Sequence, residues 1–197
     1  MKKLIALFSL LVLFQFQSCD VAKQLVGTYA LTQCKYDYNS ISGLTLAGIN
    51  LQNAGSTLNL ANSASLLSAF SSSSGSLPLS FTLNLDVSNS GAQTAILNGA
   101  NYILEIDGLE MTQGLFSQQL QVLSGGKSML PIAMAFDLKK VMSGQSLDAI
   151  KNLAFNFAGI GNSSSKVTVK LKPSFILGGN AVSLPDYIPV SFTLNNK

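Results

Sequence analysis

The chain has 197 residues, of which 47% are hydrophobic, enough to bury the core of one domain. Charged residues make up only 11%, well below the roughly 25% usual for soluble domains. Since the chain has no His, composition excludes Ser-His-Asp and Cys-His hydrolytic centres and imidazole zinc sites. All basic residues are lysines, twelve in total, and removing Lys2 and Lys3 with a leader leaves ten against nine acids. A net charge of +1 without Arg does not favour nucleic acid as a partner.

The first 18 residues are expected to be a signal peptide that is removed. Lys2 and Lys3 form a positive start, and an uninterrupted apolar run follows from Leu4 to Phe14. A helix of eleven residues rises about 16 Å, roughly half the hydrocarbon thickness of a bilayer. The run therefore reads as the apolar region of an export signal and not as a membrane span, and no second candidate span follows.

The residues Phe16-Gln17-Ser18-Cys19 resemble a bacterial lipobox, in which a small residue precedes an obligatory cysteine that is diacylated before cleavage. Ser18 and Cys19 fit, whereas Phe16 and Gln17 depart from the usual Leu and small residue. The resemblance implies cleavage between Ser18 and Cys19, a lipid on Cys19 that binds the membrane, and an anchor tether over residues 19–25. It places the protein in the cell envelope of a Gram-negative-type bacterium, with the outer membrane expected.

An ordinary secretory signal with a Cys19–Cys34 disulfide is the alternative, although no A-x-A-like cleavage site lies nearby. If Cys19 carries the lipid, Cys34 is the only thiol left in the mature chain. We then expect it to be a small buried hydrophobe and not a reactive thiol, because no His or Arg is present to lower its pKa.

The remaining elements are expected mostly to be strands, in the following order. Residues 26–38 and 43–52 have strand-like content, and Ser63–Phe70 predicts a short helix capped by Asn62. The clearest strand is Leu77–Ser88, where apolar and polar residues alternate without a miss. Further strands are expected at Tyr102–Ile106, Leu109–Met111, Leu130–Phe136, Val167–Leu171 and Ile188–Leu194. Asp107-Gly108 predicts a hairpin turn between the first two of these strands. Pro131 places the strand Leu130–Phe136 at an edge, or marks a strand start. Helical spacing from Gln145 to Gly159, with Ser146 as cap, predicts a second helix.

These elements predict a mainly β protein, an immunoglobulin-like antiparallel β-sandwich of about seven or eight strands with one or two short helical insertions. Residues 26–197 are expected to form a single domain. The polar connection SSSSGS at residues 71–76 is too short to separate two domains.

The stretch from Leu83 to Phe136 resembles the type 2 late embryogenesis abundant proteins, also called the water stress and hypersensitive response (WHy) domain. The features that carry the resemblance are Val87-Ser88-Asn89-Ser90, the strand and turn from Tyr102 to Gly108, the strand through Gly114 and the loop Gly125–Ser128. Ser90 stands where that family has proline. The resemblance implies a β-sandwich, and loosely a role in stress protection or membrane-associated binding.

The candidate sites each have a structural interpretation beside the functional one. Glu105, Asp107 and Glu110 suggest a weak cation site, but a solvated face and a turn are favoured, and no metal or cofactor is expected. Lys166, Lys170 and Lys172 line one strand face and form a possible surface for anionic lipid headgroups, or they protect an outer strand from edge-to-edge pairing.

Two further groups are expected to be structural. Tyr29, Tyr36 and Tyr38 suggest an aromatic binding patch, with a place in the sandwich core favoured. Gly125-Gly126 and Gly178-Gly179 are expected to be turns between strands and not phosphate-binding loops.

The sequence thus predicts a lipid-anchored, non-enzymatic binding or structural module with an unknown protein, glycan or lipid partner. Catalysis by carboxylates or a lysine is not excluded by composition, but no nucleophile has an evident partner. A carrier of a lipid or other hydrophobic ligand is the first alternative, and a subunit of a surface assembly is the second.

Overall fold

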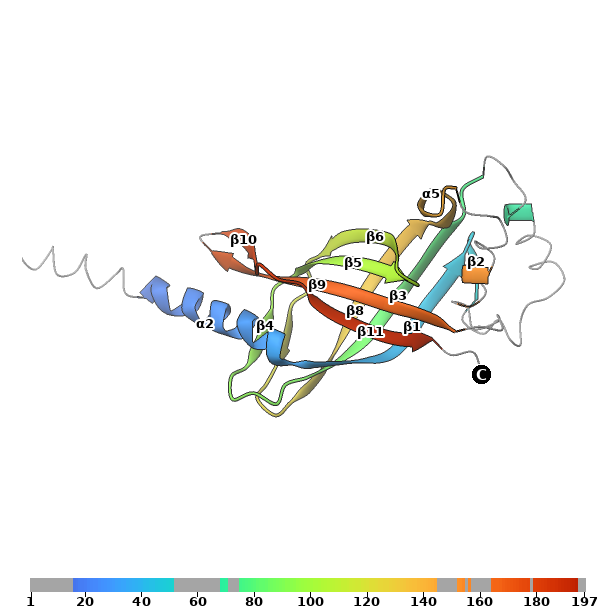
Figure 1. Cartoon of the computed structure of the whole chain (residues 1–197). Helices are drawn as coiled ribbons and strands as arrows, with labels where there is room; N and C mark the ends of the chain where they lie inside the picture. Colours follow the sequence, from blue (N-terminus) through green and yellow to red (C-terminus); the bar gives the residue numbers. More distant parts are fainter. Residues whose placement is uncertain are drawn as a thin grey trace, which may run out of the picture.

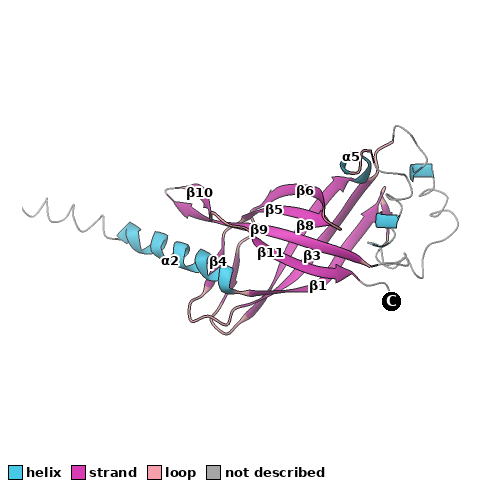
Figure 2. Cartoon of the chain, viewed as in Figure 1, coloured by secondary structure: helices cyan, strands magenta, loops and turns pink. Residues whose placement is uncertain are grey.

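Two antiparallel β-sheets stack on one another in the computed structural model, which describes residues 16–51, 68–70, 75–144, 152–154, 156, 164–177 and 179–194 (Figures 1 and 2). The first sheet has the order β2-β1-β3-β8, and the second has the order β10-β9-β5-β6 with β11 also paired to β9. The mainly β fold and the antiparallel sandwich expected from the sequence are therefore confirmed.

The strands of the first sheet are β1 (Lys35–Leu46), β2 (Ile49–Asn50), β3 (Pro78–Ser88) and β8 (Lys127–Asp137). Those of the second are β5 (Ala100–Ile106), β6 (Leu109–Phe116), β9 (Ser165–Leu177), β10 (Asn180–Ser183) and β11 (Ile188–Leu194). A separate short pair consists of β4 (Ala95–Leu97) and β7 (Leu120–Val122). The helices with assigned bounds are α2 (Phe16–Ala30), the 3-10 helix η1 (Leu31–Gln33) and α5 (Leu138–Val141).

The core lies between the two sheets, and the alternation of β3 supplies its centre. One face of β3 is buried along its whole length, because period-two alternation sends every second side chain inward. Alternate residues of β5, β8 and β9 are buried against it. The core side chains from these four strands are Leu79, Phe81, Leu83, Leu85, Val87, Ala100, Tyr102, Leu104, Ile106, Leu130, Ile132, Met134, Val167, Val169 and Leu171.

Two turn and edge predictions are confirmed. Asp107 and Gly108 have φ of 52° and 83° and connect β5 to β6 as a two-residue hairpin, the conformation for which this pair of residues is favoured. β8 ends the first sheet, which explains how Pro131, with no N–H to donate, is accommodated in a strand.

The strand expected over residues 26–38 is wrong in its first half, because α2 and η1 extend to Gln33 and β1 begins at Lys35. The buried positions of this segment include Gly27, Thr28 and Leu31, which have helical spacing. Since the first two are not strongly apolar, the hydrophobicity of the sequence does not reveal that spacing.

The second expected strand, residues 43–52, is not a separate element either. β1 continues to Leu46, turns at Ala47 and Gly48, where φ is 51° and 79°, and returns as β2. The pairing of β1 with β3 shifts register between Tyr38 and Ser40 and between Ser42 and Thr45. Each irregularity changes which residues face inward, so the alternation of apolar residues is blurred although the strand is continuous.

Of the two predicted helices, only short pieces belong to the described part of the chain. Residues 68–70 and the residues 152–154 and 156 are helical. Asn62, Ser146, Gly159 and the apolar run Leu4–Phe14 lie outside the described residues.

Candidate functional site

The end of the sandwich at which α2 enters contains the predicted anchor region (Figure 1). Residues 19–25, expected as a tether, are part of α2. The Gln24 side-chain oxygen accepts hydrogen bonds from the backbone N–H of Ile176 at 3.1 Å and from Asn98 Nδ2 at 3.5 Å. These bonds connect α2 to β9 and to the residue after β4. A lipid on Cys19 would therefore be attached to a helix that packs directly on the sandwich.

Close packing at Gly27 brings α2 against β4. A Cβ atom at this position would lie 2.7 Å from Ile96 Cγ1, closer than real Cβ contacts allow. The absence of a side chain thus sets how near the helix axis approaches the strand.

Cys34 is a buried free thiol, as expected for a small hydrophobe, and burial raises its pKa. Its Sγ donates to the Ala30 carbonyl at 3.4 Å, so it lies just beyond the last turn of α2. The helical rise from residue 19 to residue 30 is about 16 Å, whereas a disulfide needs Cα atoms within about 7 Å. This geometry does not support the alternative of a Cys19–Cys34 disulfide.

A groove of about 550 Å³ runs along one side of α2 and is open to solvent. Its walls combine apolar and polar side chains, and its residues are Ala22, Lys23, Val26, Gly27, Gln93, Thr94 and Ile96. Local sequence patterns do not reveal this groove, since it depends on α2 packing beside residues that lie about 70 positions later in the chain.

The lysines Lys166, Lys170 and Lys172 do lie at period two on β9, but β9 is not an outer strand. It pairs with β5 on one edge and with β10 and β11 on the other, so the interpretation as protection of a free edge is wrong. Lys170 Nζ donates to Glu105, and Lys172 Nζ lies 5.3 Å from the centre of the Tyr187 ring. Lys166 is exposed, so two of the three lysines already have partners within the protein.

The three acids Glu105, Asp107 and Glu110 do not form a cation site. Glu105 is paired with Lys170, and Asp107 Oδ1 accepts from the Lys166 backbone N–H at 2.8 Å across the turn. In the described part of the chain, no group of three His, Cys, Asp or Glu side chains is placed to hold a metal ion.

The tyrosines Tyr29, Tyr36 and Tyr38 are separated, so they form neither one patch nor one part of the core. Tyr29 is exposed on α2, while Tyr36 is half-buried and donates to the Leu31 carbonyl at 2.9 Å. Tyr38 stacks on Phe192 of β11 at 4.5 Å between ring centres, which joins the edges of the two sheets.

The glycine turns have the predicted structural role. Gly125 has φ of 69° in the turn before β8, and Gly179 has φ of 83° in the turn between β9 and β10. Gly178 lies outside the described residues. Neither turn opens a helix that could bind phosphate.

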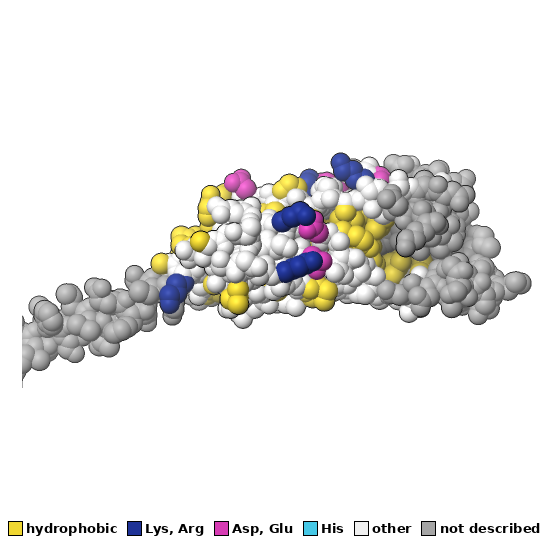
Figure 3. Space-filling model, turned by 90° about the horizontal axis from the view of Figure 1, so that it is seen from below, with side chains coloured by type: hydrophobic (Ala, Val, Ile, Leu, Met, Phe, Trp, Pro, Cys, Tyr) yellow, Lys and Arg dark blue, Asp and Glu magenta, His cyan; other side chains and the backbone are white. Residues whose placement is uncertain are grey.

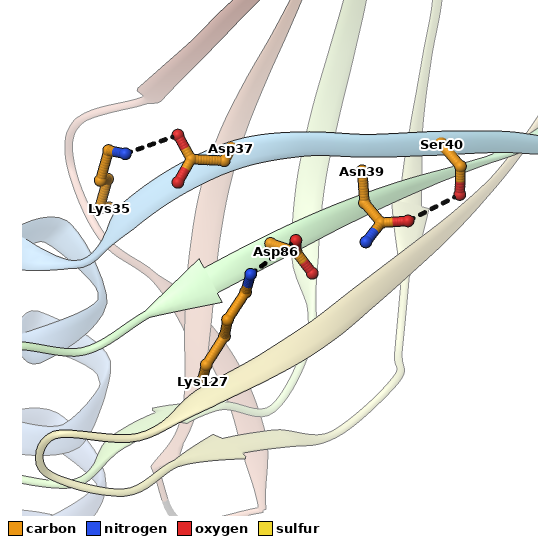
Figure 4. A network of polar contacts seen from close by, with 6 residues as sticks. All are labelled: Lys35, Asp37, Asn39, Ser40, Asp86 and Lys127. Carbon is orange, nitrogen blue, oxygen red and sulfur yellow. Dashed lines mark hydrogen bonds and ion pairs between the residues drawn. The ribbon is translucent and has the colours of Figure 1, made fainter.

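A polar network on the first sheet was not predicted (Figure 4). Lys35 pairs with Asp37 at 2.9 Å, and Lys127 pairs with Asp86 at 2.8 Å. Hydrogen bonds from Lys127 and Asn39 lower the pKa of Asp86. Lys35 and Asp37 are two positions apart on β1, whereas Lys127 of β8 and Asp86 of β3 are brought together by strand pairing, which local sequence patterns do not report.

Comparison with protein families and with curated proteins finds no match. Similarity to solved structures is weak. A crystal structure of a protein from Archaeoglobus fulgidus has 12% identity and a TM-score of 0.33, covering 82% of this chain and 95% of that one. A solution structure of a protein from Arabidopsis thaliana has 11% identity and a TM-score of 0.36, covering 58% of this chain and 67% of that one. An X-ray structure of a structural-genomics target, SoR45, has 11% identity and a TM-score of 0.33, covering 82% of each chain. At these values the similarities assign no function.

Proposed function

We propose that this protein is a lipid-anchored β-sandwich of a bacterial cell envelope that acts as a non-enzymatic binding or structural module. The observation that carries the proposal is Ser18-Cys19 three residues after an apolar run of export-signal length. The structure is compatible with it, because residue 19 belongs to a helix that is hydrogen-bonded to the sandwich through Gln24. Among the described helices, none is long and apolar enough to cross a membrane. The stress-protective role implied by the late embryogenesis abundant resemblance belongs to the same proposal.

The decisive experiment compares Cys19→Ala with Cys34→Ala in a bacterial host. The wild-type protein is expected in the membrane fraction, with an N-terminal peptide that begins at Cys19 and carries acyl chains by mass spectrometry. Cys19→Ala should accumulate as unprocessed precursor or soluble material. Cys34→Ala is the matched control, because it removes the only other cysteine and should leave processing and membrane association intact.

Two results would overturn the anchoring. One is an unmodified Cys19 in the mature wild-type protein. The other is a Cys19→Ala variant that is processed and fractionates like the wild type.

A carrier of a hydrophobic ligand is the second candidate, and the groove beside α2 is the observation that favours it. Val26 and Ile96 give it apolar walls, while its open side gives a ligand direct access. Native mass spectrometry of the purified protein after exposure to a panel of lipids is the test. A carrier should retain a bound lipid, and Val26→Asp should reduce retention; the absence of any adduct across the panel would reject this candidate.

A surface assembly formed by strand addition is less favoured. Strand addition would use the end strands of the sheets, which are β2 and β8 in the first sheet and β6, β10 and β11 in the second. However, β8 contains Pro131, and proline on an edge strand opposes pairing with another chain.

A further inference from the structure

The helix α2 packs on the sandwich with its less apolar side. Gln24, Gly27 and Thr28 face inward, and the buried Thr28 hydroxyl has no hydrogen-bond partner among the described residues. On the outer side, Leu25, Val26 and Tyr29 are 45%, 49% and 59% exposed. A surface helix normally has the opposite arrangement, with its apolar stripe toward the core. The outer stripe of α2 therefore lacks a partner within the described part of the chain.

The hairpin of β9 and β10 lies at the same end of the molecule as α2 (Figure 1) and also exposes apolar side chains. Ile176, Leu177 and Val182 are exposed near its tip, and the Ile176 backbone N–H binds Gln24 of α2. Residues 174–183 contain no charged side chain, and residues 19–30 contain one acid, Asp20, and one lysine, Lys23. Figure 3 shows apolar side chains at the end where the chain enters, beside a basic and an acidic side chain, and further apolar and charged side chains along the body.

We propose that this anchor surface, defined as Leu25, Val26, Tyr29, Ile176, Leu177 and Val182, lies in the interfacial region of the lipid bilayer. The inference rests on the lipid anchor proposed above. Residue 19 belongs to α2 and lies seven positions before Val26, which is two helical turns. Acyl chains attached there bring the bilayer to the uncharged surface.

A bilayer explains the composition of the surface better than a soluble partner does. The chain before α2 is itself apolar from Leu4 to Phe14, so the molecule meets a membrane at this end during export. Exposed apolar side chains near a lysine are a pattern of segments that lie in the headgroup region of anionic membranes. The lipid and the anchor surface would together fix the orientation of the sandwich, with the β5–β6 hairpin pointing away from the membrane.

Tryptophan fluorescence provides the test, because the chain contains no Trp. Tyr29→Trp and Leu177→Trp place a probe on each half of the anchor surface. Leu109→Trp is the matched control, since Leu109 is also exposed but lies beside Ile106, which pairs with Val167 near the far end of β9. The nine residues from 167 to 176 span about 30 Å of strand. Each full-length variant is purified from membranes and reconstituted into phosphatidylethanolamine–phosphatidylglycerol vesicles, with or without brominated acyl chains.

We expect both anchor-surface probes to shift to the blue on reconstitution and to be quenched by brominated lipid at least about twofold more than the Leu109→Trp control. Equal quenching at all three positions would overturn the inference. So would a blue shift that is already present in detergent and depends on protein concentration, because a second copy would then cover the surface. Mass spectrometry of the same samples reports the lipid on Cys19, so failure of surface contact is distinguished from failure of anchoring.

Discussion

At the scale of single residues, Asn89 holds an irregular loop to the sandwich. Its side chain is 3% exposed, and its Nδ2 donates to the carbonyls of Gln93 at 2.8 Å and Val122 at 2.9 Å. Its Oδ1 accepts from the Gly91 N–H at 3.0 Å. In the sequence Asn89 is part of a family-like motif, whereas the structure shows a buried amide whose nitrogen and oxygen both have hydrogen-bond partners.

Replacing Asn89 by Ala should lower the free energy of unfolding by about 2–3 kcal/mol, because the buried Val122 carbonyl and the part-buried Gln93 carbonyl would lose their donor. Urea unfolding followed by circular dichroism measures the change. Asn39→Ala is the control on the solvated network of the first sheet, and its effect should stay within about 0.5 kcal/mol. Equal effects of the two substitutions would show that the Asn89 contacts contribute little.

At the scale of elements, the contact between α2 and β4 depends on Gly27. A glycine inside an exposed helix normally makes Gly→Ala stabilising by about 1 kcal/mol. Here the added Cβ would meet Ile96, so Gly27→Ala should instead destabilise the protein by about 1–3 kcal/mol. The substitution is informative because the expected change in the free energy of unfolding has the opposite sign to that of Gly→Ala in an ordinary exposed helix.

A double-mutant cycle measured by urea unfolding isolates that contact. Ile96→Ala removes the Cγ1 and Cδ1 atoms that approach Gly27, so adding Gly27→Ala to Ile96→Ala should be neutral or stabilising. Additive effects in the cycle would mean that α2 does not pack on β4 at this distance.

The same elements show which parts of the fold the sequence predicts. β3 is evident because one side of it is buried along its whole length, which leaves an unbroken alternation. For β1 the sequence predicts two strands in place of one, because register shifts interrupt the alternation of apolar residues. The sequence does not predict α2 as a helix, because the inward side of α2 carries Gln24, Gly27 and Thr28, which are not strongly apolar. Ion pairs such as Lys170–Glu105 join residues 65 positions apart and cannot be found from local spacing.

At the scale of the whole molecule, the absence of His leaves no side chain that ordinarily titrates near neutral pH. Among the described residues, the groups with shifted pKa values titrate either well below or well above neutral pH. For Asp137, burial raises the pKa, but hydrogen bonds from Ser76 and from the backbone N–H groups of Leu77, Lys139 and Lys140 outweigh it, so the pKa falls below 3.8. On the alkaline side, burial raises the pKa of Cys34 above 9.0 and, together with the neighbouring Cys34, raises the pKa of Tyr36 above 10.0.

Stability should therefore be flat between about pH 5 and pH 8 and fall on both sides. A carboxyl with a lowered folded pKa stabilises the protein above its unfolded pKa, and this contribution is lost as the pH falls through the folded value. A thiol or phenol with a raised folded pKa favours folding while it is neutral, and this contribution is lost once the pH exceeds the unfolded value. Urea midpoints across the pH range measure both limbs, and Tyr36→Phe should flatten the alkaline limb while leaving the acid limb unchanged. A midpoint that changes between pH 6 and pH 7 would contradict this account, because it would require a titrating group that the composition does not supply.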